Sequence, residues 1–152
     1  MRSGLTCLLI AMVFSIIPAA SQARTPPVPT RILDPVMAGK LKENKGITLQ
    51  WIDWDRRGTV WISDTDGEWA LRAAQSELQG PGALFLDGRI VEIGADYFLF
   101  DGIVRITNTP GAGRTCEKRA VWRFAVTQNR PYWRIRQFEW CDGLTDYIDI
   151  YF

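Results

Sequence analysis

Short segments in which apolar and polar residues alternate run through the chain from Ile47 onward. In residues 47–51 three apolar residues alternate with Thr48 and Gln50, and the same period of two returns at 59–63, 119–126 and 147–152. A period of two places successive side chains on opposite faces of a β-strand. The sequence therefore predicts an all-β domain, a single antiparallel β-meander that closes as a small barrel or sandwich of about eight to nine strands.

Turn sequences separate these segments. The dipeptide Asp-Gly begins at positions 66, 87, 101 and 142, and both of its residues tolerate the positive φ angles of tight hairpins. Asp-Arg-Arg-Gly at 55–58 and Gln-Asn-Arg-Pro at 128–131 are further turn sequences. Residues 85–93 and 99–106 also resemble each other, since each contains an apolar pair, Asp-Gly and a β-branched run. We expect the chain to fold back at these sites.

The first 23 residues have the pattern of an export signal. Arg2 precedes an apolar run over 5–17, Pro18 ends the run, and small residues over 19–23 form a cleavage site. The run of about 13 residues is shorter than the roughly 20 that a membrane-spanning helix needs, so we expect no transmembrane segment after signal removal. Residues 24–46 follow as a proline-rich extended leader, in which 36–45 can form one or two helical turns before Gly46, and the β domain spans 47–152.

Net charge restricts the class of partner, and the cysteine content predicts a disulfide. Removal of Arg2 with the signal leaves 17 basic and 17 acidic residues, and a chain without net positive charge is a poor nucleic-acid binder, so we expect no nucleic-acid partner. Cys116 and Cys141 then remain as the one pair of thiols. In an oxidising compartment they are expected to form a disulfide, which would stabilise the fold by roughly 3 kcal/mol.

The chain has no histidine, which excludes Ser-His-Asp and Cys-His nucleophiles, histidine general bases and ordinary zinc sites. Carboxylate chemistry remains, and aspartates are close in sequence at 53 and 55, at 64 and 66, and at 142, 146 and 149. Nearly all of them fall in turns, where aspartate bonds to the local backbone. We therefore assign no catalytic residue and expect no cofactor and no metal.

The hairpin over residues 117–140 carries the most distinctive side chains. If Asn129 and Arg130 form its tip, one strand face presents guanidinium groups and aromatic rings, a composition typical of binding hot spots and suited to anionic or sugar ligands. This predicted face comprises Arg119, Arg123, Tyr132, Arg134, Arg136, Phe138 and Trp140. Separately, Trp51 and Trp54 are three positions apart, so a regular strand would point them to opposite faces and leave one exposed.

Two short motifs resemble those of known families. Gly67-Glu68-Trp69 and Thr145-Asp146-Tyr147 are similar to the Gly-x-Trp and Thr-Asp-Tyr motifs of lipocalins, which implies an exported barrel that holds a small apolar ligand. The chain ends five residues after the second motif, so we carry over no binding residues. The C-terminal Ile148-x-Ile150-x-Phe152 is similar to the last strand of outer-membrane barrels, but strands rich in arginine favour a soluble body.

Together these features predict an exported protein, periplasmic or secreted, that acts as a non-catalytic binding module. The expected partner is an anionic or glycan envelope ligand or another exported protein, bound through the Arg and aromatic face. The alternatives are a lipocalin-like carrier barrel, a hydrolase that depends on paired carboxylates, and a structural envelope protein.

Overall fold

The computed structural model describes residues 26–152. The predicted signal, residues 1–23, lies outside the described residues. Within 26–152 no helix is long and apolar enough to cross a bilayer. In chain order the elements are β1 (Arg31–Ile32), α1 (Pro35–Lys42), β2 (Ile47–Leu49), β3 (Thr59–Thr65), β4 (Glu68–Ser76), β5 (Ala83–Ile93), β6 (Tyr97–Thr107), β7 (Thr115–Ala125), β8 (Tyr132–Ile135) and β9 (Ile148–Tyr151).

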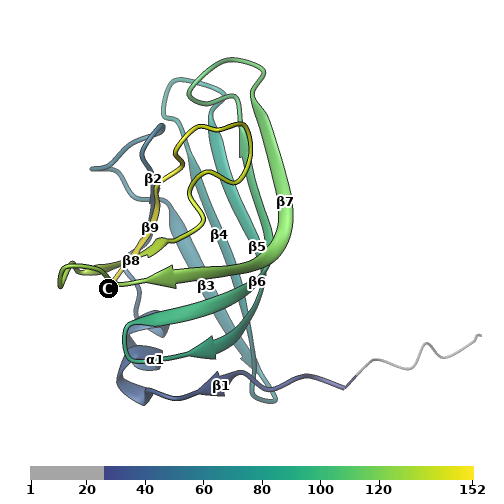
Figure 1. Cartoon of the computed structure of the whole chain (residues 1–152), viewed down its shortest axis with the longest axis vertical. Coiled ribbons are helices and arrows are strands. Elements are labelled where there is room, and N and C mark those ends of the chain that lie inside the picture. The colour runs from purple at the N-terminus through teal and green to yellow at the C-terminus, as the bar shows by residue number, and fades with distance from the viewer. Residues whose placement is uncertain (1–25) are drawn as a thin grey trace, which may run out of the picture.

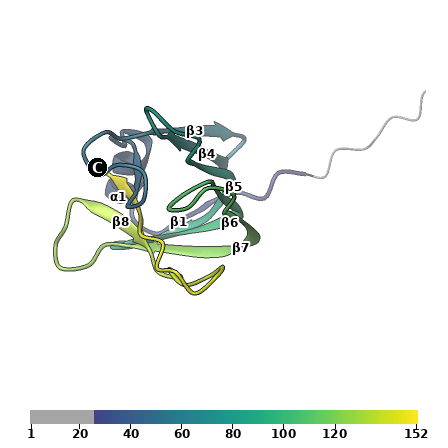
Figure 2. The ribbon, with the colours of Figure 1, turned by 90° about the horizontal axis from the view of Figure 1, so that it is seen from above.

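The strands form one sheet in the order β2-β9-β8-β7-β6-β5-β4-β3, and all neighbours on this path are antiparallel. The sheet curls until its two ends meet. At this junction Ile47 of β2 and Gly58, just before β3, exchange backbone hydrogen bonds of 3.1 and 2.8 Å. Seen from above, the strands wrap around a common interior (Figures 1 and 2). The all-β prediction is confirmed, and the architecture is a nearly closed barrel.

Large side chains fill the interior of this barrel. Trp122, Trp133, Phe98, Phe100 and Phe124 are each at most 1% exposed. Phe98 stacks on Phe124 with ring centroids 4.9 Å apart and meets Trp133 edge-on at 5.6 Å. Apolar residues that point inward alternate along the strands with polar residues that point outward. The core therefore consists of the apolar residues of the alternating pattern that predicts the fold.

Helix α1 covers one end of the barrel (Figure 1). It begins after Asp34, whose side chain accepts hydrogen bonds from the backbone N–H groups of Val36 and Met37, as an N-cap residue does. Met37, Ala38 and Leu41 point into the core. The predicted short helix is therefore present. Ahead of it, β1 pairs in parallel with the end of β5.

Two of the four expected Asp-Gly turns are wrong. Asp66-Gly67 does form the β3–β4 turn, with φ of 52° and 84°, and Asp142-Gly143 lies in the β8–β9 connection. Gly88 and Gly102, however, pair with each other in the middle of β5 and β6. A Cβ on either would collide with the Phe100 ring and the facing backbone. These two glycines serve close packing and not chain reversal.

Candidate functional site

The predicted Arg and aromatic face forms only over part of the β7–β8 hairpin. Its turn is where the sequence places it, with Gln128 and Asn129 at positive φ. Ala125 pairs with Arg134, and the backbone N–H of Arg136 donates to the Arg123 carbonyl at 2.8 Å. Beyond Arg136 the chain leaves the sheet and enters the long connection to β9. The face therefore ends earlier than a regular strand to Trp140 would allow.

A surface cleft of about 390 Å³ gathers the part of the face that does form. Three of the predicted residues, Arg134, Arg136 and Phe138, line it. Tyr132 lies beside it, because its hydroxyl accepts a hydrogen bond of 2.9 Å from Arg130. The full lining, which we call the basic cleft, is Thr127, Gln128, Arg130, Arg134, Arg136, Phe138 and Tyr147.

The remaining three predicted residues lie elsewhere. Arg123 covers the Tyr97 ring, with its guanidinium 3.9 Å from the ring centroid. Arg119 pairs across the sheet with Ile103, in the middle of β6. Trp140 packs edge-on against Trp122 at 5.3 Å, on the core side. Trp140 is followed by Cys141, which is bonded to Cys116 of β7.

Arg134 is the buried centre of the site. Its Nε and Nη2 donate to the two carboxylate oxygens of Asp149 at 2.7 and 2.6 Å, and the two side chains are 15% and 1% exposed. Its guanidinium also lies 4.2 Å from the ring centroid of Tyr147. Burial raises the pKa of Asp149, and the Arg134 guanidinium opposes this by stabilising the charged carboxylate. Arg134 thus holds the wall of the basic cleft in place while its own charge is balanced.

Arg130 and Arg136 give the basic cleft its net charge. Both are exposed, and within residues 26–152 neither forms an ion pair. Arg119 and Arg123 on β7 also lack an ion pair there, whereas Arg72, Arg89 and Arg105 are each paired with a carboxylate. Arg136 lies over Phe138 at 5.3 Å and Arg130 over Tyr132 at 5.9 Å. Two guanidinium groups therefore keep unused donors beside aromatic rings, an arrangement suited to an anion.

Sequence reasoning missed Arg130, Tyr147, Thr127 and Gln128 as lining residues. The sequence predicts Arg130 at the hairpin tip, and the structure places it in the lining of the cleft. Tyr147 comes from the connection that leads into β9, the neighbour of β8. The alternation of Tyr147, Asp149 and Tyr151 with apolar residues gave a signal, since it puts these three on one face. The sequence does not reveal that β9 pairs with β8, which brings this face next to Arg134.

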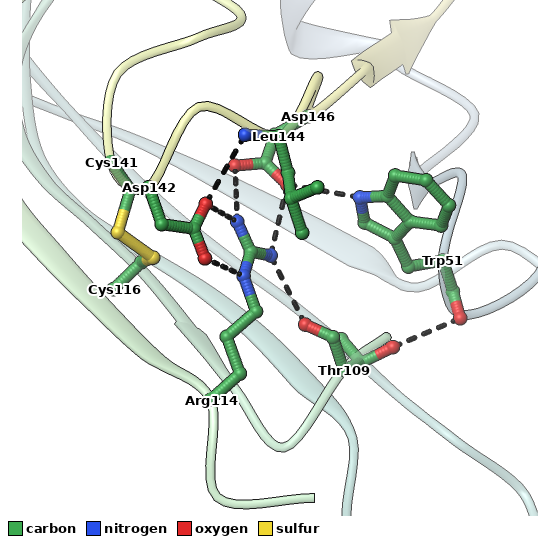
Figure 3. Close-up of a disulfide and its surroundings, with 8 residues drawn as sticks. All are labelled: Trp51, Thr109, Arg114, Cys116, Cys141, Asp142, Leu144 and Asp146. Carbon is green, nitrogen blue, oxygen red and sulfur yellow. Dashed lines mark hydrogen bonds and ion pairs between the residues drawn. A yellow bond between two sulfur atoms is a disulfide. The ribbon is translucent and has the colours of Figure 1, made fainter. Parts of the chain in front are cut away.

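The wall of the cleft is anchored by a second cluster, which we call the Arg114 clamp (Figure 3). Arg114 binds both oxygens of Asp142 at 2.7 and 2.8 Å and both oxygens of Asp146 at 3.0 Å. Its side chain also donates to the Thr109 carbonyl at 3.0 Å. The Trp51 indole donates to Asp146 at 3.0 Å. Loops after β2, β6 and β8 are thereby joined at one buried carboxylate.

The clamp lies next to the disulfide and connects directly to the cleft. The predicted Cys116–Cys141 bond is present, and Asp142 follows it in the chain. The backbone N–H of Asp146 donates to the Phe138 carbonyl at 2.7 Å, and the Phe138 and Tyr147 rings meet edge-on at 5.5 Å. Hydrogen bonds from Arg114 lower the pKa of Asp142 to about 2. The clamp and disulfide therefore position both aromatic walls of the cleft.

Most of the aspartates considered for catalysis are bound to other groups of the protein. Asp142 and Asp146 bind Arg114, and Asp149 binds Arg134. Asp53 accepts hydrogen bonds from the backbone N–H groups of Asp55 and Arg56, as expected for a turn residue. Cys116, Cys141 and Asp142 bring possible metal-ligand atoms within 4.8 Å of one another, but both sulfurs are bonded to each other. These groups are explained by local structure.

Comparison with known proteins identifies a family. An uncharacterized protein of Pasteurella multocida (strain Pm70), PM1083, is 35% identical to this chain over 154 residues, which cover all of this chain and 96% of that relative. No solved structure matches. The model of the PM1083 family matches residues 29–152, that is, the described barrel almost in full. The chain belongs to the PM1083 family.

Proposed function

We propose that this protein is an exported, non-catalytic binding module that holds an anionic ligand in the basic cleft. The ligand is an envelope polymer or a segment of another exported protein. The observation that carries the proposal is the pair of arginines, Arg130 and Arg136, which have no carboxylate partner within residues 26–152. The chain as a whole is nearly neutral, so this positive charge is local.

The surroundings of the cleft support binding. Phe138 and Tyr147 are held in place by the Arg114 clamp, and Arg134 is fixed by Asp149, so the walls are formed before a ligand arrives. Preorganised walls lower the entropic cost of binding. The free guanidinium groups can each make two parallel hydrogen bonds to a carboxylate, sulfate or phosphate.

Two features favour surface binding over the alternative functions. The barrel interior is occupied by tryptophan and phenylalanine side chains, whereas a carrier barrel needs room for its ligand. Arginines bind the three aspartates of the C-terminal segment, Asp142, Asp146 and Asp149. A glycosidase, in contrast, needs two carboxylates that face the substrate. Export is supported by the disulfide, because such bonds persist in oxidising compartments.

The proposal is tested by titrating the mature protein with anionic polymers at low salt while tryptophan fluorescence is recorded. Arg130→Ala and Arg136→Ala should each weaken binding about tenfold, the value expected for loss of a charge-assisted contact. Arg119→Ala, on β7 but away from the cleft, is the matched control and should bind as the unmodified protein does. The proposal is refuted if Arg130→Ala and Arg136→Ala bind as tightly as Arg119→Ala and the unmodified protein do, or if no anion binds.

A further inference from the structure

We propose that the ligand of the basic cleft is an acidic sugar chain, bound by guanidinium contacts to its anionic groups and by aromatic contacts to its sugar rings. This inference rests on the proposed function, because it names the ligand class for the same site. Carboxylated and sulfated sugar chains share this chemistry, and the experiment below separates them from each other and from acidic protein segments.

The first argument is the number of aromatic rings in and beside the cleft. Phe138 and Tyr147 line the cleft. Trp54, which is 42% exposed, lies 5.7 Å from the Arg134 guanidinium and thus borders the same surface. Binding an anion alone requires donors but no rings. The Phe138 and Tyr147 side chains are partly exposed and offer apolar surface, which suits the C–H faces of sugar rings.

The position of Trp54 is informative because of its neighbour Trp51. Trp51 points inward and donates its indole N–H to Asp146, whereas Trp54 remains at the surface. A large exposed indole beside a cleft costs solvation energy that a packed position would avoid. Trp54 does not itself line the cleft, but its ring contacts Arg134, which does.

The second argument is the arrangement of charge. Arg130 belongs to the turn before β8 and Arg136 to the segment after β8, with the neutralised Arg134 between them in the chain. The other residues that line the cleft are Phe138, Tyr147, Thr127 and Gln128. An acidic sugar chain is complementary to this lining. Its anionic groups pair with guanidinium groups, its ring faces contact aromatic rings, and its hydroxyls can hydrogen-bond to threonine and glutamine side chains.

An acidic protein segment fits these observations less well. Aspartate and glutamate side chains would meet Arg130 and Arg136, but they carry little apolar surface for the rings. The two ligand classes therefore differ in how much the aromatic residues contribute to affinity. Trp54 and Phe138 should matter for a sugar chain, and only the arginines should matter for an acidic peptide.

The experiment uses four probes of similar chain length: polygalacturonate, a heparin fragment, poly-L-glutamate and neutral dextran. Affinities are measured by isothermal titration calorimetry for the unmodified protein and for Trp54→Ala, Phe138→Leu and Arg136→Ala. Trp61→Ala is the matched control, because Trp61 is 56% exposed and lies on β3, away from the cleft. Circular dichroism confirms that each variant is folded.

We expect the affinity for at least one acidic sugar chain to exceed the affinity for poly-L-glutamate about tenfold or more. Dextran should bind weakly. Trp54→Ala and Phe138→Leu should reduce sugar-chain affinity severalfold and leave poly-L-glutamate affinity unchanged, while Arg136→Ala reduces both. Tighter binding of polygalacturonate identifies carboxylate as the group bound, and tighter binding of heparin, which carries both groups, shows that sulfate adds to the affinity. If poly-L-glutamate binds as well as the sugar chains and Trp54→Ala has no effect, the sugar assignment is wrong while anion binding stands. If no probe binds, both proposals fail.

Discussion

Arg134 and Asp149 face each other across the β8–β9 pair and form a two-point ion pair on the side of the sheet away from the core. Both are largely shielded from water, with side chains 15% and 1% exposed. Removing one partner from such a pair leaves an uncompensated buried charge, whereas replacing both can be nearly neutral. The pair is therefore a structural support for the basic cleft.

We expect Asp149→Leu to lower the free energy of unfolding by roughly 3–5 kcal/mol, because Arg134 then remains charged and unpaired. The double variant Arg134→Met, Asp149→Leu should recover most of this loss. Urea unfolding of the two single variants and the double variant measures the coupling. Strictly additive losses would show that the two side chains do not depend on each other.

Asp142 should make stability depend on pH in the acidic range. Its pKa is lowered from about 3.8 to about 2 by hydrogen bonds from Arg114, so the folded state binds this proton less readily than the unfolded state. Its contribution is complete above the unfolded pKa and is lost as pH falls towards 2. The difference in unfolding free energy between the unmodified protein and Asp142→Asn should thus shrink over this interval.

Urea midpoints at several acidic pH values measure that difference. The same substitution in an Arg114→Met background is the control, because the cause of the lowered pKa is then absent. A difference that stays constant down to pH 2 in the unmodified background would contradict the role of Arg114.

Loss of the disulfide should affect both stability and binding. Cys116→Ala with Cys141→Ala should cost roughly 3 kcal/mol, as expected for a closed loop with a sequence separation of 25. Because Cys141 ends the segment that carries Arg136 and Phe138, anion affinity should also fall. Denaturant unfolding and calorimetry check the two effects. Unchanged affinity in the folded variant would mean that the Arg114 clamp positions the cleft without the disulfide.

Gly102 should not tolerate a side chain. Gly102→Ala places a Cβ against the Phe100 ring and the facing Asp87 carbonyl, and overpacking of this kind costs roughly 1–3 kcal/mol. Gly39→Ala is the matched control, since a Cβ there meets nothing within 4 Å, and in helix α1 it should stabilise by roughly 0.5–1 kcal/mol. Thermal unfolding compares the two. Equal tolerance at both positions would be inconsistent with close packing at Gly102.

These glycines also show where prediction from sequence reaches its limit. The dipeptide at 66 and the dipeptides at 87 and 101 are identical, yet the first is a turn and the others lie within long strands. The difference comes from tertiary packing, because Gly88 and Gly102 face each other and make room for Phe100. The similarity of residues 85–93 and 99–106 reflects this pairing of neighbouring strands and not two successive turns.

Much of the remaining fold follows from periodicity. The period of two at 119–126 and 147–152 appears in the structure as β7 and β9, whose inward side chains Trp122, Phe124, Ile148 and Ile150 are buried in the core. The disulfide follows from counting cysteines. The extent of the Arg and aromatic face could not be predicted, because the connection that follows Arg136 is held by the Cys116–Cys141 bond and by the clamp at Asp146, which join residues distant in sequence.

The location of the binding surface can be measured directly by recording amide chemical shifts of the mature protein while polygalacturonate or heparin is added. The proposed function predicts that the largest shifts fall at residues 127–138 and at Tyr147, the segments that form the basic cleft. Shifts concentrated on the outer face around Trp61, Arg72 and Arg119, or no shifts with either polymer, would contradict it.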